Sequence, residues 1–234
     1  MDFAIDIPTL QNITYIISSV LFITGIKMLG KESTAVKGNF LSAVAMFIAV
    51  GITCIGLVNP IVLFSGILLG AIIGSFIALK VKMTSIPEMV ALFNGFGGLA
   101  TFLIAWSQFN VTGNSLFQHA LIMLTIYIGG ITFSGSLVAY GKLSERLKLG
   151  KGSWITNVLI SFFYLSIPAL VYVIFEPSLS SVIPTVPSYF LFFVGLTLLA
   201  GLGFVTPIGG GDMPVVISLL NSLSGIAAAF AGLL

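Results

Sequence analysis

The strongest constraint on this fold is a succession of eight apolar segments, each long enough to cross a bilayer. A transmembrane helix needs about 20 mainly apolar residues to cross roughly 30 Å of hydrocarbon. The segments run over 9–30, 37–57, 60–79, 86–107, 115–141, 153–175, 188–206 and 213–234. Glycine, proline, asparagine or charged residues occupy the connections, as in turns. The pattern predicts an all-α fold, a polytopic transmembrane helix bundle of about eight spans, with 1–234 as a single transmembrane domain.

The composition excludes several classes of protein. Of the 234 residues, 58% are hydrophobic and only 7% are charged, whereas roughly a quarter of the residues of a soluble domain are charged. A soluble enzyme, a nucleic-acid binder and a disordered protein are therefore excluded, and membrane lipid is the expected surrounding. The first apolar segment follows Asp2 and Asp6 rather than lysines, and no small-residue cleavage site follows it. It is predicted to be a retained span and not a signal peptide.

The positive charges predict the orientation of the chain. All nine lysines and arginines lie in the first, third and fifth connections or at their edges: Lys27, Lys31, Lys37, Lys80, Lys82, Lys142, Arg146, Lys148 and Lys151. In an alternating eight-span topology these connections share one side, which the positive-inside bias makes cytoplasmic. The N-terminus is then predicted to lie outside, and so is Leu234. Because the chain is still apolar there, we expect either a fragment or a further span.

Amides and hydroxyls are the polar groups predicted at membrane depth. At 1.5 Å per residue, Asn94 and Asn221 each lie about 12 Å from the cytoplasmic ends of their spans. On the same scale Ser136 lies about 8 Å and Thr132 about 14 Å deep. Three helices thus bring polar groups to one layer. Such groups either hydrogen-bond packed helices to each other or line a hydrated pathway, and the sequence leaves both interpretations open.

Two acidic residues are expected at the cytoplasmic mouths of the spans. Glu88 begins the fourth span, and Asp212 follows Gly209, Gly210 and Gly211 at the start of the eighth. Asp212 suits an N-cap, but a carboxylate beside a glycine-rich hinge is also able to accept or relay a proton. Phosphate binding by these glycines is rejected, because no lysine accompanies them and the aspartate would repel the anion.

The remaining distinctive residues predict structural roles. His119 is the only histidine and Cys54 the only cysteine, so neither a metal site nor an intrachain disulfide is expected. Gly66, Gly70 and Gly74 form a small-xxx-small seam, which is typical of helix packing in membranes.

Four sequence blocks resemble one protein family. They read MTSIPEMVALFNG at 83–95, GGGDMPVVISLLNSLSG at 209–225, TFSGS with GKL at 132–136 and 141–143, and KEST with GN at 31–34 and 38–39. Taken in chain order, they are similar to the β subunit of proton-translocating NAD(P) transhydrogenase, and they cover nearly the whole chain.

The resemblance implies a function and a set of partners. The family couples hydride transfer between NAD(H) and NADP(H) to proton passage across the inner membrane. This chain would be the membrane part of the β subunit, without the last span and the NADP(H)-binding domain. It would bind no cofactor itself and act as an enzyme only within a complex. The implied partners are the NAD-binding and membrane parts of the α subunit, the NADP(H)-binding domain, and a second αβ unit in a homodimer.

Site residues follow from the resemblance position by position. Asp212, Asn221 and Ser136 match positions implicated in proton passage or in coupling to the NADP(H) domain, and Glu88 matches an acidic position near the mouth. Asn94 departs from the pattern, because many members carry a proton-carrying histidine there. Either the α membrane subunit supplies that histidine here, or the pathway relies on water and Asp212.

Two other classes of function compete with this one. A secondary transporter or channel would use the polar layer as a solute site, although the inverted repeats and broken helices typical of transporters are not found in the sequence. A purely structural membrane subunit would need no conducting layer.

Overall fold

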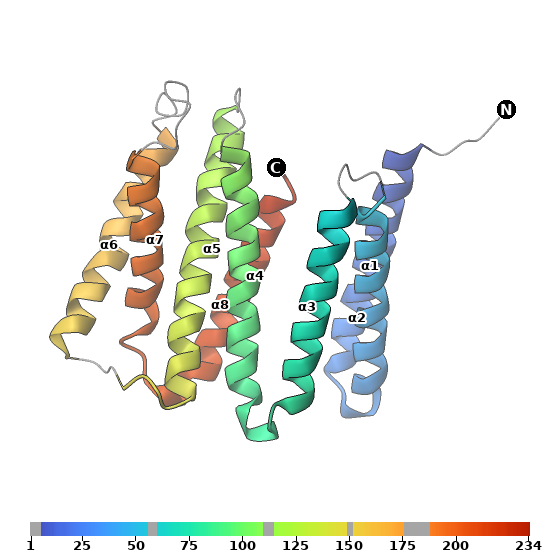
Figure 1. The fold of residues 1–234 in the computed structure, drawn as a ribbon, viewed down its shortest axis with the longest axis horizontal. Helices are drawn as coiled ribbons and strands as arrows, with labels where there is room; N and C mark the ends of the chain where they lie inside the picture. Colours follow the sequence, from blue (N-terminus) through green and yellow to red (C-terminus); the bar gives the residue numbers. More distant parts are fainter. Residues whose placement is uncertain (1–5, 56–59, 110–114, 149–151, 176–187) are drawn as a thin grey trace. The chain divides into compact units, whose positions relative to one another are not determined.

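The computed structural model describes residues 6–55, 60–109, 115–148, 152–175 and 188–234, and these residues contain helices and no strand. The helices are α1 (Ile7–Leu29), α2 (Glu32–Thr53), α3 (Pro60–Lys80), α4 (Ile86–Phe109), α5 (Leu116–Leu143), α6 (Trp154–Phe175), α7 (Ser188–Val205) and α8 (Met213–Ala231) (Figure 1). Short 3-10 turns, Met83–Ser85 and Gly210–Asp212, precede α4 and α8. Seven of the described helices are long and apolar enough to cross a membrane. The eighth, α7, counts as a shorter apolar helix over Phe190–Val205. The predicted all-α bundle of about eight spans is confirmed.

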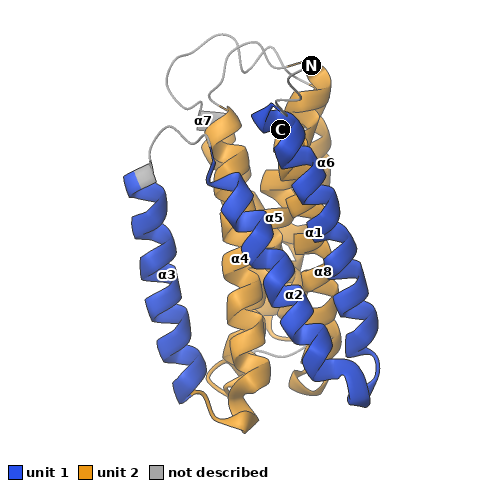
Figure 2. Ribbon diagram, turned by 90° about the vertical axis from the view of Figure 1, so that its right-hand side faces the viewer, with its two compact units in different colours: residues 1–80 blue, residues 81–234 orange. Residues whose placement is uncertain are grey.

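The chain divides into two compact units, residues 1–80 and 81–234 (Figure 2). The expected single transmembrane domain stays a prediction, and each unit is described by itself. In the first unit the backbones of α1 and α2 lie close together at two glycines. A Cβ placed on Gly38 would lie only 2.7 Å from the Gly25 carbonyl oxygen. Such contact between backbones is typical of small residues in membrane helices.

Helix α3 has no buried residue between 61 and 80. A Cβ placed on Gly66, Gly70 or Gly74 would have no other atom within 4 Å. The packing predicted for this glycine seam therefore has no counterpart among the described residues, and it stays a prediction.

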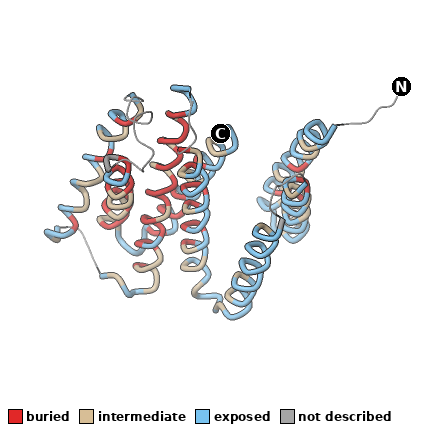
Figure 3. The backbone as a smooth tube through the Cα atoms, turned by 45° about the horizontal axis from the view of Figure 1, so that its top comes forward, coloured by how far each residue is buried: buried red, intermediate tan, exposed pale blue. Residues whose placement is uncertain are grey.

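Helix α5 is the centre of the second unit. It packs against α4, α6, α7 and α8, and it is the most extensively buried helix described (Figure 3). It begins with a capping box, in which Ser115 and Gln118 each bond the other's backbone N–H. It ends at Leu143 with Ser144 as its C-cap, and Glu145, just beyond, adopts a positive φ of 57°. A central helix buried on several faces fixes the positions of the side chains that it presents to each neighbour.

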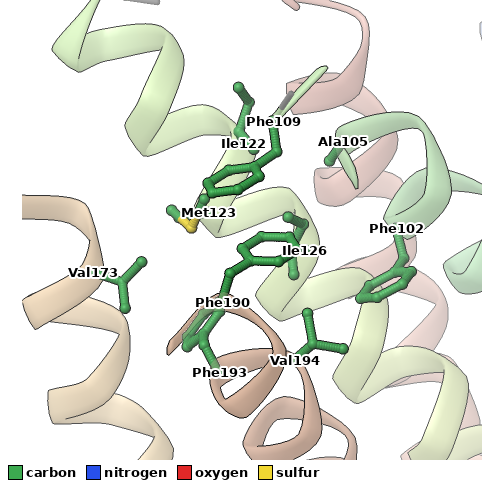
Figure 4. Close-up of a cluster of buried hydrophobic side chains, with 10 residues drawn as sticks. All are labelled: Phe102, Ala105, Phe109, Ile122, Met123, Ile126, Val173, Phe190, Phe193 and Val194. Carbon is green, nitrogen blue, oxygen red and sulfur yellow. The ribbon is translucent and has the colours of Figure 1, made fainter. Parts of the chain in front are cut away.

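Two apolar clusters fill the second unit at different depths. The aromatic cluster comprises Phe102, Ala105, Phe109, Ile122, Met123, Ile126, Val173, Phe190, Phe193 and Val194 (Figure 4). Its Phe109 and Phe190 rings stack with centroids 3.9 Å apart. The aliphatic cluster comprises Ala91, Val138, Ala139, Val205, Met213, Val216, Ile217 and Leu220. Along α4, α5 and α8, the residues between the two clusters are partly polar.

The described charged residues of the second unit lie at one end, where α4 and α8 begin and α5 ends: Lys82, Glu88, Lys142, Glu145, Arg146, Lys148 and Asp212. The aliphatic cluster is at this charged end. Lys151 lies outside the described residues. The asymmetry agrees with the positive-inside argument. The predicted orientation, with the N-terminus outside, stays a prediction.

Candidate functional site

Glycines set the close approach of α4 and α5. A Cβ placed on Gly98 would lie 2.9 Å from the Gly129 carbonyl oxygen, and one on Gly129 would lie 2.8 Å from the Gly98 carbonyl oxygen. The two backbones are therefore in direct contact. Asn94 lies about one turn before Gly98 on α4, and Ser136 lies about two turns after Gly129 on α5, where their side chains meet.

Hydrogen bonds join three helices at this level. The Asn94 amide Nδ2 donates to Ser136 Oγ at 3.1 Å, and the Ser224 hydroxyl lies 3.0 Å from Asn94 Oδ1. The same hydroxyl lies 2.8 Å from the Asn221 carbonyl oxygen, so it donates to both acceptors in a shared bond. Asn94 and Ser136 are buried and Ser224 is half-buried. We call Asn94, Thr132, Ser136 and Ser224 the polar layer.

Thr132 is the unsatisfied member of the polar layer. Its side chain is fully buried, and its Oγ1 has no hydrogen-bond partner among the described residues. A buried hydroxyl without a partner costs about 1–3 kcal/mol. Native structures satisfy such groups with ordered water or a neighbouring polar group. The polar layer therefore has unused capacity for a water molecule or a partner's side chain.

The structure brings together some of the predicted residues and not others. Asn94, Thr132 and Ser136 meet at the α4–α5 contact, whereas the Asn221 side chain is exposed on α8. Ser224, which the sequence analysis did not single out, takes the place expected of Asn221. Exposed with Asn221 on α8 are Ser218, Ser222 and Gly225. The second unit thus has a buried polar layer and, next to it on α8, an exposed polar face.

The acidic residues lie at the charged end of the unit. Asp212 occupies the N-cap position of α8, as predicted, but its side chain makes no capping hydrogen bond and is exposed. Its backbone is helical, with φ −91° and ψ −1°, rather than extended as N-cap residues usually are. Glu88 is half-buried in the first turn of α4. The Asp212 carboxylate is therefore not committed to a capping role.

The glycines before Asp212 adopt ordinary backbone conformations. Gly209 has φ −68° and ψ 156°, and Gly210 and Gly211 belong to the 3-10 turn. Among the described residues, Gly152 is the only glycine with a positive φ. A Cβ placed on Gly210 or Gly211 would meet no other atom within 4 Å. Nothing in this conformation of the segment requires glycine.

A lysine bonds the connection that leads into these glycines. Lys142, near the end of α5, is buried, and its Nζ donates to the carbonyl oxygens of Thr206 and Ile208 just after α7. From the sequence, Lys142 was expected as one of the positive charges of a connection and as part of the GKL block at 141–143. Its burial depends on how α5 and α7 pack, which the sequence alone did not indicate.

His119 bonds a neighbouring helix inside the second unit. It is buried, and its Nε2 lies 3.0 Å from the Val173 carbonyl oxygen. The described residues contain no group of three or more His, Cys, Asp or Glu side chains that could hold a metal ion.

An apolar groove of about 400 Å³ lies elsewhere in the second unit. It is lined by Tyr127, Ile128, Ile131, Phe163, Ile167, Phe204, Leu219 and Leu223. The Tyr127 hydroxyl is bonded to Ser166 Oγ at 2.8 Å. No residue of the polar layer lines the groove, so it is not suited to a polar solute.

The fold and the polar layer define a multi-pass helical membrane protein. Residues 11–234 match the family model of the NAD(P) transhydrogenase beta subunit. The chain belongs to this family, which confirms the resemblance seen in the sequence. Two sequences of the NAD(P) transhydrogenase subunit beta of Rhodospirillum rubrum are each 35% identical to it over 240 residues. These alignments cover 96% of this chain and 49% of each relative, so the chain spans about half the length of the curated relatives it matches.

Proposed function

We propose that this chain is the proton-conducting membrane part of an NAD(P) transhydrogenase in the inner (cell) membrane. It would couple proton translocation to hydride transfer between NAD(H) and NADP(H) in partner domains, and would bind neither nucleotide itself. Family membership and the multi-pass fold support this proposal. The observation that carries it is the polar layer, in which the buried Thr132 hydroxyl has no hydrogen-bond partner in the described part of a largely apolar bundle.

The proposed conduction step needs a titrating group from outside this chain. The Asn94 amide holds its place by bonds to Ser136 and Ser224, but an amide does not take up a proton at neutral pH. A histidine of the α membrane subunit would supply the titrating group, approaching from the exposed polar face of α8. Water held by Thr132, Ser136 and the exposed Asn221 amide would connect that histidine to the polar layer.

The charged end of the unit would carry the signal to the nucleotide domains. Glu88, half-buried in the first turn of α4, would take part in proton exchange at the mouth. Asp212, whose carboxylate makes no capping bond, would report the protonation state to the NADP(H)-binding domain through Gly209, Gly210 and Gly211. Coupling requires an element with two states that both sites bias. The proposed partners are the α subunit, the NADP(H)-binding domain and, in a homodimer, a second αβ unit.

The test uses the complete complex, assembled with its partner subunits in proteoliposomes. Ser136→Ala should lower the number of protons pumped per hydride transferred, because it removes the acceptor that orients the Asn94 amide. Ser134→Ala is the matched control: it changes the same residue type at nearly the same depth of α5, but Ser134 bonds only the Gly130 carbonyl of its own helix. Asp212→Asn should abolish coupling while assembly persists. Wild-type coupling in both Ser136→Ala and Asp212→Asn would refute the proposal.

The geometry does not favour a solute transporter. Direct backbone contact at Gly98 and Gly129 closes the α4–α5 side of the polar layer, and the described groove is apolar. Proteoliposomes of this chain alone should therefore transport no small solute. A purely structural role would instead predict wild-type coupling in Asn221→Leu, together with co-purification of nucleotide-binding partners.

A further inference from the structure

We infer that Lys142 is a positioning residue, which fixes the connection between α7 and α8 and thereby places Asp212. The inference rests on the proposed function, because it names the link between the polar layer and the segment that would signal to the nucleotide domain.

The Lys142 environment is unusual for a lysine. Only 8% of the residue is exposed, whereas lysines are almost never fully buried unless they are paired. The Nζ donates to the carbonyl oxygens of Thr206 and Ile208. These carbonyls follow the last turn of α7. At the C-terminal end of a helix the backbone carbonyls lack N–H partners within the helix, and the helix dipole places partial negative charge there. The Lys142 ammonium, which belongs to α5, thus supplies hydrogen-bond donors to the carbonyl oxygens just after α7.

The segment that receives these bonds has few backbone hydrogen bonds of its own, although the half-buried Ile208 packs against the aliphatic cluster. Pro207 has no N–H and cannot continue the helix. Beyond it the backbone makes two turn bonds, from Ile208 N to Val205 O at 3.1 Å and from Asp212 N to Gly209 O at 3.2 Å. The intervening glycines have no side chains to pack. Asp212 is therefore held from the α8 side by Met213, which is buried in the aliphatic cluster, and from the α7 side by the two bonds from Lys142.

Lys142 shares a rigid helix with the polar layer. It lies six residues after Ser136, about 9 Å further along the α5 axis. Between them Val138 and Ala139 pack in the aliphatic cluster with Val205 and Met213, which flank the connection. A shift or rotation of α5 caused by a change at Ser136 would move the ammonium, and the carbonyls bonded to it would follow. Lys142 therefore makes the connection respond to the polar layer.

The experiment compares three variants in the assembled complex. Lys142→Met removes the donor and keeps the length of the side chain, Lys142→Arg keeps a charged donor, and Lys148→Met removes an exposed lysine at the same end as a control. Hydrogen exchange is measured over residues 206–212, and protons pumped per hydride are measured in proteoliposomes. Lys142→Met should exchange about tenfold faster and lose coupling. Lys142→Arg should keep the exchange rate and the coupling close to those of the wild type, and Lys148→Met should match the wild type.

Several results would overturn the inference. Wild-type exchange in Lys142→Met would show that the connection does not depend on the ammonium. Faster exchange in Lys142→Met with full coupling would show that the bonds have no role in signalling. A loss of coupling in Lys148→Met as large as that in Lys142→Met would show the same. If Lys142→Met does not assemble, Lys142→Leu, which also removes the donor, is subjected to the same two measurements and the same criteria. The exchange measurement needs no enzymatic activity, so it tests the placement of the connection even if the complex pumps no protons.

Discussion

Replacing Gly210 or Gly211 by alanine tests whether the connection between α7 and α8 keeps one conformation or changes conformation during coupling. In the observed conformation neither glycine has a positive φ, and a Cβ on either meets no other atom within 4 Å. Alanine at a compatible position stabilises a protein by about 0.4–1 kcal/mol, chiefly because it restricts the unfolded chain. Unfolding in detergent should therefore show both variants to be as stable as the wild type or slightly more so.

A hinge that moves would give a different result for activity. If the second state of the segment places Gly210 or Gly211 at positive φ, alanine disfavours that state by about 1–2 kcal/mol. Its population then falls by a factor of about 5–30, and the coupled rate of the complex in proteoliposomes falls with it. Gly97→Ala is the control, because Gly97 is exposed on α4 with no other atom within 4 Å of its Cβ position. Full coupling in both hinge variants, with normal stability, would refute the hinge.

Three further predictions concern stability and are measured by unfolding in detergent. Gly203→Ala should destabilise the chain by about 1–3 kcal/mol, because the new methyl group would overlap the Leu159 carbonyl; no change would show that α6 and α7 separate freely. Glu145→Gly should stabilise it by about 1 kcal/mol, since φ is 57° there; a loss would mean that the glutamate side chain contributes more than the strain. A double-mutant cycle of Asn94→Leu and Ser136→Ala should give a coupling energy of about 0.6 kcal/mol, the average for membrane hydrogen bonds; additive effects would contradict the bond.

Most of the fold could be predicted from the sequence, because the bilayer imposes a minimum length on every span. The predicted segment 86–107 and the observed α4, Ile86–Phe109, differ by two residues. The second helix begins at Glu32, five residues before the predicted start at 37. Its first turn is helical but polar, so a search for apolar segments omits it.

The rotation of α8 was harder to predict. The depth of amide and hydroxyl groups along the spans singled out Asn221 on this helix, and its side chain is exposed. The rotation is set instead by burial of Met213, Ile217 and Leu220 in the aliphatic cluster. Ser224 lies one turn beyond Leu220 and shares that face. The apolar spacing therefore contained a signal for Ser224, but polar spacing alone did not indicate it.

The aromatic cluster limits where a proton path can run in the proposed function. Beyond the polar layer, on the side away from the charged end, three buried hydroxyls donate to carbonyls of their own helices: Thr101 to Gly98, Thr125 to Leu121 and Thr197 to Phe193. Stacked rings such as Phe109 and Phe190 fill the space around them. In the proposed function, a proton that reaches the polar layer from the charged end would leave it sideways, through Ser224 to the exposed face of α8. The proposed α subunit would cover that face and carry the titrating group. For this reason Asn221→Leu should leave the stability of the chain unchanged and still block conduction in the complex.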